Sequence, residues 1–272
     1  MDVSQHVQSV MERIRQAALA AGREPGEITL CAATKVQTDE TIRAAIAAGV
    51  RVCGENRVQE LVAHLAADAY AGAEQVHFIG HLQTNKVKQV VGHVDLIQSV
   101  GSAHLLQAIQ NQADKQGIIQ DILLEVNIGM EESKGGVDPA QLRPLAELAQ
   151  SLPHVRLRGL MAIPPISPLP GANRPFFAKM YQLFVDIRRE MSDNQCDIDC
   201  LSMGMSGDFE DAIAEGARAF LAAEYRVLVI FVAVLFVVIG LGTHSWITAG
   251  CFLVGSAFST AAGYLGMSAA IR

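Results

Sequence analysis

Charged residues are scarce in this sequence, and the signatures of several protein classes are missing from it. Of the 272 residues only 18% are charged, and the formal net charge is −7. This acidic balance argues against a nucleic-acid partner, since no stretch of interleaved basic and aromatic residues offsets it. The N-terminus also lacks the apolar core of a signal peptide, and Ser4 can instead cap an amphipathic helix that ends before Gly22. We therefore expect a cytoplasmic protein.

The sequence also contains few cysteines, and their positions do not indicate a set of disulfide bonds. The five cysteines are an odd number and stand in strand-like and helix-like segments, which indicates reduced thiols. Cys196 and Cys200 have a spacing seen in zinc half-sites, but no second Cys or His pair lies nearby. We therefore predict no metal site.

The rest of the chain alternates short apolar runs with longer amphipathic segments. Runs this apolar indicate parallel strands buried on both faces, as in an α/β fold. Seven strand–helix units are present, whereas a TIM-type (β/α)₈ barrel needs an eighth strand. The predicted strands are 28–34, 50–53, 76–79, 96–100, 118–126, 157–162 and 198–202. The predicted helices are 39–48, 57–67, 83–91, 102–116, 139–151, 175–191 and 209–215.

Lys35 directly follows the first predicted strand, ITLCAAT. A lysine at the carboxyl end of a buried strand points into the mouth of a barrel, where desolvation lowers its pKa. The neutral amine is the form that attacks an aldehyde to give an imine. The alternative is a solvated lysine that opens a loop.

Polar residues follow other strands in the same way. Asn56 comes after the second strand and either hydrogen-bonds a cofactor's ring oxygen or caps the next helix. His77 and His81 flank the end of the third strand, as possible ligands or bases or as structural histidines. Small residues at 202–208 precede a helix whose positive end suits a phosphate; capping by Ser206 or Asp208 is the alternative reading.

Six motifs together resemble the pyridoxal phosphate homeostasis protein family (YggS/PROSC type), related in fold to the N-terminal domain of alanine racemase. They are ATK at 33–35, GENRVQE at 54–60, HFIGHLQTNK at 77–86, SKGG at 133–136, RLRGLMAIPP at 156–165 and LSMGMSGDFEDAIAEG at 201–216. The resemblance covers residues 1–216 almost continuously.

This resemblance implies a barrel that binds pyridoxal 5′-phosphate (PLP) and contributes to its homeostasis without substrate turnover. Lys35 would hold PLP as a Schiff base, Asn56 would lie beside the ring, and Met161 would be close to the pocket. The phosphate side would be lined by Ser202, Gly204, Met205 and Ser206. PLP-dependent apo-enzymes would be the partners that receive PLP.

The resemblance ends at Ala217, where the family continues into an eighth strand that carries an arginine and part of the phosphate site. Two alternatives therefore stay open. One is a PLP-dependent amino-acid racemase, although such enzymes need a second base from an additional domain, which nothing here resembles. The other is a non-functional fusion or membrane protein with an incomplete barrel.

From Val227 to Ile271 the sequence contains no Asp, Glu, Lys or Arg. Two apolar stretches joined near Trp246 have about the length of membrane-crossing helices. We therefore predict a linker at 217–226 and a two-helix transmembrane hairpin over 227–271 that tethers the barrel. A core helix followed by a replacement strand is the alternative. The tail also resembles the start of a membrane-bound ion-pumping pyrophosphatase, without that family's acidic pyrophosphate-binding motifs, so a joined reading frame is a further hypothesis.

Overall fold

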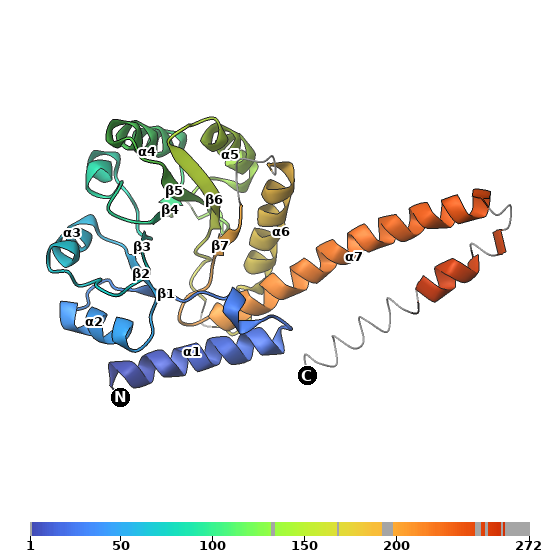
Figure 1. Ribbon diagram of the computed structural model, residues 1–272, viewed down its shortest axis with the longest axis horizontal. Helices are drawn as coiled ribbons and strands as arrows, with labels where there is room; N and C mark the ends of the chain where they lie inside the picture. The colour runs from blue at the N-terminus through green and yellow to red at the C-terminus, as the bar shows by residue number, and fades with distance from the viewer. Residues whose placement is uncertain are drawn as a thin grey trace.

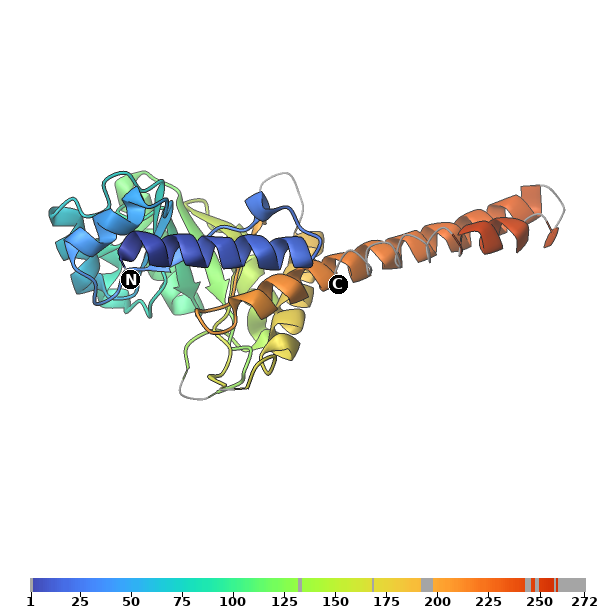
Figure 2. The same cartoon turned by 90° about the horizontal axis from the view of Figure 1, so that it is seen from below.

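A computed structural model describes residues 2–131, 134–167, 169–191, 198–242, 246–247, 250–256 and 258, without the side chains of 217–230 and 240. Its main body is a curved parallel sheet with helices outside it, and one long helix extends away from this body (Figures 1 and 2). The architecture is α/β, as the sequence predicts.

The sheet has seven strands in the order of the chain, all of them parallel. This confirms the seven strand–helix units and gives a barrel-like, seven-stranded half-barrel. No strand follows β7 within the part of the chain that the structure describes. The strands are β1 (Cys31–Ala33), β2 (Val52–Glu55), β3 (Gln75–Phe78), β4 (Leu96–Val100), β5 (Gln120–Glu125), β6 (Val155–Met161) and β7 (Cys200–Ser202).

The helices follow the predicted order with two differences. The segment predicted as a helix at 83–91 forms the 3₁₀-helix η2 over 84–89, and Val87, Val90 and Val91 in this segment disfavour a longer α-helix. The first helix is capped by Asp2, not Ser4, because Asp2 and Gln5 form a reciprocal capping box. The elements are α1 (Val3–Ala20), η1 (Pro25–Glu27), α2 (Asp39–Ala47), α3 (Val58–Ala66), η2 (Thr84–Gln89), α4 (Ala103–Gln116), η3 (Pro139–Gln141), α5 (Leu142–Gln150), α6 (Arg174–Glu190) and α7 (Phe209–Gly242).

The helix α1 passes beneath β1 and meets the start of α7 (Figure 1). Ile14 and Ala18 of α1 form a buried apolar cluster with Ile213 of α7. The guanidinium of Arg13 lies 4.6 Å from the ring centroid of Phe209 and also pairs with Glu210. These contacts attach the two ends of the half-barrel to each other.

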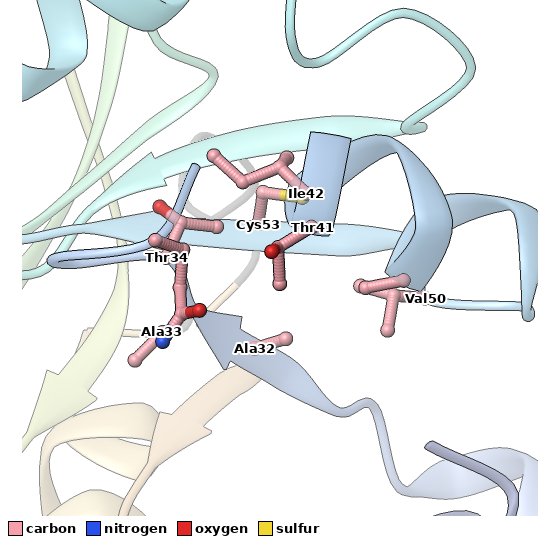
Figure 3. Close-up of a pocket in the computed structure, with 9 residues that line it drawn as sticks. Ala32, Ala33, Thr34, Thr41, Ile42, Val50 and Cys53 are labelled. Atoms are coloured by element: carbon pink, nitrogen blue, oxygen red, sulfur yellow. The ribbon is translucent and has the colours of Figure 1, made fainter. Parts of the chain in front are cut away.

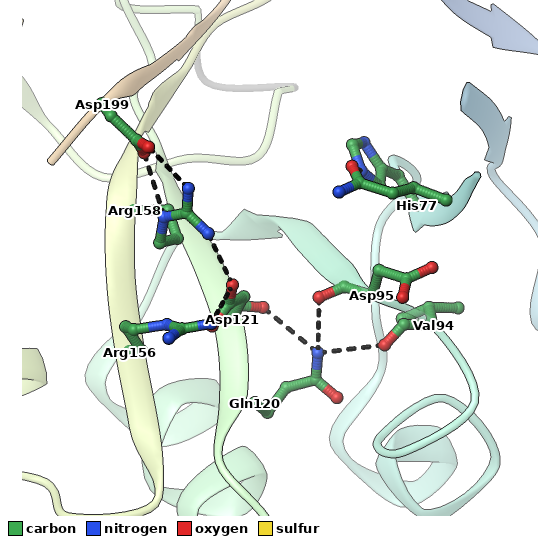
Figure 4. A network of polar contacts seen from close by, with 9 residues as sticks. His77, Val94, Asp95, Gln120, Asp121, Arg156, Arg158 and Asp199 are labelled. Atoms are coloured by element: carbon green, nitrogen blue, oxygen red, sulfur yellow. Dashed lines mark hydrogen bonds and ion pairs between the residues drawn. The ribbon is translucent and has the colours of Figure 1, made fainter. Parts of the chain in front are cut away.

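Ion pairs hold the amino ends of the last three strands together (Figure 4). Arg158 on β6 donates to Asp121 on β5 at 2.9 Å and to Asp199, just before β7, at 2.6 Å. Arg156 pairs with the same Asp121 carboxylate at 2.6 Å. Hydrogen bonding to Asp199 raises the pKa of Arg158, so the guanidinium is permanently charged. These ion pairs lie at the end of the sheet opposite to the carboxyl ends of the strands, where barrel active sites are built.

The helix α7 continues far beyond the predicted end at residue 215, so the backbone of residues 217–226, expected as a linker, is helical. Its outer half carries exposed apolar side chains such as Phe231, Val234 and Leu241. The rings of Phe236 and Trp246 lie 5.8 Å apart, which places Trp246 beside the last turns of α7.

The predicted transmembrane hairpin over 227–271 is not supported. Among the residues that the structure describes, no helix combines the length and the apolarity needed to cross a membrane. Most of the predicted second span, from residue 259 onward, lies outside the described residues. The membrane tether inferred from this hairpin is therefore unsupported as well.

Candidate functional site

The predicted site residues lie at the carboxyl ends of the strands. Ala33 of β1 pairs with Gly54 of β2, so Lys35 and Asn56 leave two neighbouring strands at the same level. At the far side of the sheet Met161 of β6 pairs with Ser202 of β7. The carboxyl ends of barrel strands are where the active sites of this architecture are built.

Lys35 is exposed and stands in a tight turn after β1. The N–H of Thr34 donates to the carbonyl of Gly54 at 2.9 Å, and the N–H of Gln37 donates back to the carbonyl of Thr34 at 3.1 Å. The hydroxyl of Thr34 donates to Oε2 of the fully buried Glu55 at 2.9 Å. The strand end that precedes Lys35 is thus fixed by buried hydrogen bonds.

Asn56 presents an acceptor that has no partner. Its Oδ1 is buried and makes no hydrogen bond within the described chain, which is rare for a buried polar atom. Its backbone N–H donates to Oε1 of Glu55 at 2.7 Å. Behind it the backbone of Gly80 lies so close that a Cβ there would be 2.0 Å from the Asn56 carbonyl oxygen. The backbone of Asn56 is therefore held in place, and its amide oxygen can accept a hydrogen bond from a ligand.

A chain of hydrogen bonds crosses the interior from β7 to β3. The hydroxyl of Ser202 donates to Oε1 of Gln98 at 2.7 Å, and Nε2 of Gln98 donates to Nδ1 of His77 at 2.8 Å. Nε2 of His77 in turn lies 2.8 Å from Oε1 of Gln75. Burial lowers the pKa of His77 to about 4, so the ring is neutral at physiological pH. His77 is a structural histidine whose two nitrogens are both engaged.

Met161 lies in the same interior, where it is buried against Leu96, Leu123 and Cys200. Burial raises the pKa of Cys200 to about 11, and the described cysteines are all free. The reduced state of the thiols stays a prediction, and Cys196 lies outside the described residues.

The loop after β7 is shaped by Gly204 and Asp208. Gly204 has φ +87°, and a Cβ there would be 2.9 Å from Cα of Phe209, so only glycine fits. Oδ1 of Asp208 accepts the N–H of Met205 at 2.6 Å, and Oδ2 accepts from Asn173 at 2.7 Å. Met205 and Ser206 are exposed. Both carboxylate oxygens of Asp208 therefore accept from residues outside α7, and neither of these bonds caps the helix, so capping by Ser206 or Asp208 stays a prediction.

The sequence did not single out Glu55, Glu60 or Gln98, which organise this end of the barrel. Glu55 ends β2, Glu60 lies on α3 and Gln98 lies in the middle of β4, so no shared sequence position marks them. Ligand atoms of Glu55, Glu60 and His64 lie within 4.8 Å of one another. Each already accepts or shares a hydrogen bond from the chain itself, and we assign no metal to them.

One cavity of about 150 Å³ lies behind the Lys35 turn, between α2 and the first two strands (Figure 3). It is lined mainly by apolar side chains, including Ala32 of β1, Ile42 of α2, Val50 before β2 and Cys53 of β2. Thr34 and Gln37, on either side of the Lys35 turn, belong to its lining, whereas Lys35 and Asn56 do not.

Fold and site together define a class of protein. The family model of the alanine racemase N-terminal domain matches residues 6–222. A structure of an unknown protein from Bifidobacterium adolescentis is 39% identical with a TM-score of 0.73, over 79% of this chain and 90% of that one. This is an α/β barrel of the alanine racemase N-terminal class.

Within that class, the pyridoxal phosphate homeostasis protein of Aquifex aeolicus is 44% identical over 80% of this chain and 93% of its own length. The corresponding protein of Pseudomonas aeruginosa is 38% identical over 79% and 90%. PipY of Synechococcus elongatus, solved with PLP bound, is 35% identical with a TM-score of 0.64, over 76% of this chain and 94% of that one. The chain belongs to the pyridoxal phosphate homeostasis protein family.

The C-terminal part is similar to a different family. The model of inorganic H⁺ pyrophosphatase matches residues 202–272, which overlaps the end of the barrel match. The predicted resemblances of both parts of the sequence are thus confirmed.

Proposed function

We propose that this chain binds PLP covalently through Lys35 and holds it for PLP homeostasis without turning over a substrate. The observation that carries the proposal is the pairing of an exposed lysine with a buried, unpaired amide oxygen at neighbouring strand ends. The PLP-bound structure of PipY, at 35% identity, supports it.

The residues present fit this cofactor. PLP supplies an aldehyde, and a C=N bond to Nζ of Lys35 forms with release of one water. Oδ1 of Asn56 is free to accept a hydrogen bond from a ring hydroxyl. Ser202, Gly204, Met205 and Ser206 would line the phosphate side, at the start of α7, where the helix dipole favours an anion. Met161 would close the pocket from β6.

Two features support binding without turnover. His77, the interior histidine, is neutral and hydrogen-bonded through both nitrogens, so it is not a free base. Asp208 uses one carboxylate oxygen on Met205 and the other on Asn173. A racemase of this fold needs a second base on the opposite face of the cofactor, and neither of these two groups is free to act as one.

The absorption spectrum of the purified protein with added PLP tests the central claim. We expect a visible band in the parent and in Lys115→Ala, a matched control at an exposed position on α4, and none in Lys35→Ala. A band of equal strength in Lys35→Ala would overturn the proposal. Formation of D-alanine from L-alanine would instead establish the racemase alternative, and PLP transfer to a PLP-dependent apo-enzyme would support the carrier role.

We also propose that the barrel comprises residues 1–216 and the apolar tail 227–271, with 217–226 as the junction inside α7. The exposed apolar side chains of Phe231, Val234, Val238 and Leu241 support this division, since they contact no part of the barrel core. Trypsin should cut at Arg218 or Arg226 and release a fragment that keeps the PLP band. Loss of the band on cleavage would show that the tail belongs to the barrel.

A further inference from the structure

The turn that carries Lys35 contains a strained residue. Val36 has φ +62°, in the left-handed region that a β-branched side chain strongly disfavours. Its side chain is 75% exposed, so packing of Val36 itself does not hold this conformation. Something outside the turn must stabilise it.

The carboxylate of Glu60 supplies that support. Oε2 of Glu60, on α3, accepts the backbone N–H of Val36 at 2.8 Å. This N–H belongs to the peptide that joins Lys35 to Val36. A charged acceptor makes such a bond stronger than a neutral one. The other oxygen, Oε1, accepts from Nη1 of Arg57 at 2.9 Å.

The residues on either side of this peptide are held independently. The hydroxyl of Thr34 donates to Glu55, and the N–H of Gln37 donates to the carbonyl of Thr34. These bonds fix where β1 ends and where the turn closes. They leave the orientation of the Lys35–Val36 peptide to Glu60, and that orientation sets the direction in which the lysine side chain leaves the strand.

We propose that Glu60 is a positioning residue, which clamps the Lys35–Val36 peptide in its strained conformation and so aims Lys35 at its aldehyde ligand. The inference rests on the proposed function. Glu60 takes no part in the bond change itself, in which Nζ of Lys35 forms the C=N bond and the aldehyde oxygen leaves as water. Its contribution is to hold the amine ready before the aldehyde arrives.

Four variants test this, with PLP titrated against the visible band of the full chain and the melting temperature recorded for each. Glu60→Ala removes the acceptor and should weaken PLP binding about ten-fold. Glu60→Gln keeps an acceptor oxygen at the same reach and should lie within about three-fold of the parent. Arg57→Ala removes only the exposed ion pair and should match the parent.

The fourth variant adds Val36→Gly to Glu60→Ala. Because glycine adopts positive φ without strain, the double variant should recover most of the lost affinity. A role of Glu60 in folding alone predicts no such recovery. Should Glu60→Ala fail to fold, Glu60→Met, which keeps the length of the side chain, provides the same comparison.

The outcomes separate the two hypotheses. If the parent shows no PLP band, the proposed function fails and the positioning role with it. If the parent shows the band and Glu60→Ala binds PLP within about two-fold of it, only the positioning role is overturned. It is also overturned if the double variant stays as weak as Glu60→Ala.

Discussion

Replacing Gln98 with leucine should destabilise the barrel from inside. Gln98 is 3% exposed and connects β7 to β3 through its bonds to Ser202 and His77, at 2.7 and 2.8 Å. Leucine has a similar volume but makes neither bond. Each neutral hydrogen bond contributes about 1 kcal/mol, and a buried polar group left unpaired costs about 1–3 kcal/mol. We therefore expect the free energy of unfolding to fall by about 2–4 kcal/mol.

Urea unfolding followed by far-UV circular dichroism measures this loss. The matched control is Gln107→Leu, because Gln107 is exposed on α4 and bonds only to Asn111, at 3.0 Å; its change should stay within about 0.5 kcal/mol. Adding Ser202→Ala to Gln98→Leu should restore part of the stability, since it removes the unpaired hydroxyl. Equal losses in Gln98→Leu and Gln107→Leu would refute the claim that the interior hydrogen-bond chain supports the barrel.

Three further predictions concern residues in or next to the strands of the sheet. The pKa of His77 is about 4 in the folded protein and about 6.5 in an unfolded chain, so below pH 6.5 only the unfolded state takes up the proton. Stability should therefore be level above about pH 6.5 and fall by about 3 kcal/mol as the pH drops to 4, and His77→Gln should flatten this dependence in urea unfolding measured from pH 4 to 7. An unchanged slope in that variant would assign the acid sensitivity to other groups. Gly80→Ala would place a Cβ 2.0 Å from the Asn56 carbonyl oxygen, and we expect PLP affinity in a spectral titration to drop about ten-fold or more; parent-like affinity would contradict the role given to Asn56. Gly159→Ala would place a Cβ 1.7 Å from the Cys200 carbonyl oxygen, so the pairing of β6 with β7 should be lost at a cost above about 3 kcal/mol by urea unfolding. Gly26→Ala, with no atom within 4 Å of the new Cβ, is the control for both glycine variants and should behave as the parent.

The strand predictions succeed where burial on both faces dictates composition. The predicted run 96–100 coincides with β4, and the run 118–126 contains β5. The prediction at 28–34 is longer than β1, whose three residues lie at an open edge of the sheet. Apolarity predicts that a segment is buried, whereas the length of a strand depends on which neighbour pairs with it.

The tail is where the sequence prediction was weakest. The end of the family resemblance at Ala217 and the absence of charge from 227 onward predicted a linker at 217–226, but α7 passes through it without interruption. The residues at 217–226 are mostly good helix formers, and the apolar stretch at 227–242 contains no proline that would end the helix. The change to an apolar composition at residue 227 indicates a different environment for the side chains, but a helix can continue through such a change.

The sequence by itself determined the alternation of strands and helices, the place of Lys35 and Asn56 after the first two strands, and the family. These follow from local composition and from motifs that lie close together in the chain. Only the tertiary structure decided which polar groups meet across the barrel: Ser202 with Gln98 and His77, and Glu60 with the peptide after Lys35. Such contacts join residues on different elements, and a sequence pattern gives the face of an element but not the partner that the fold brings to it.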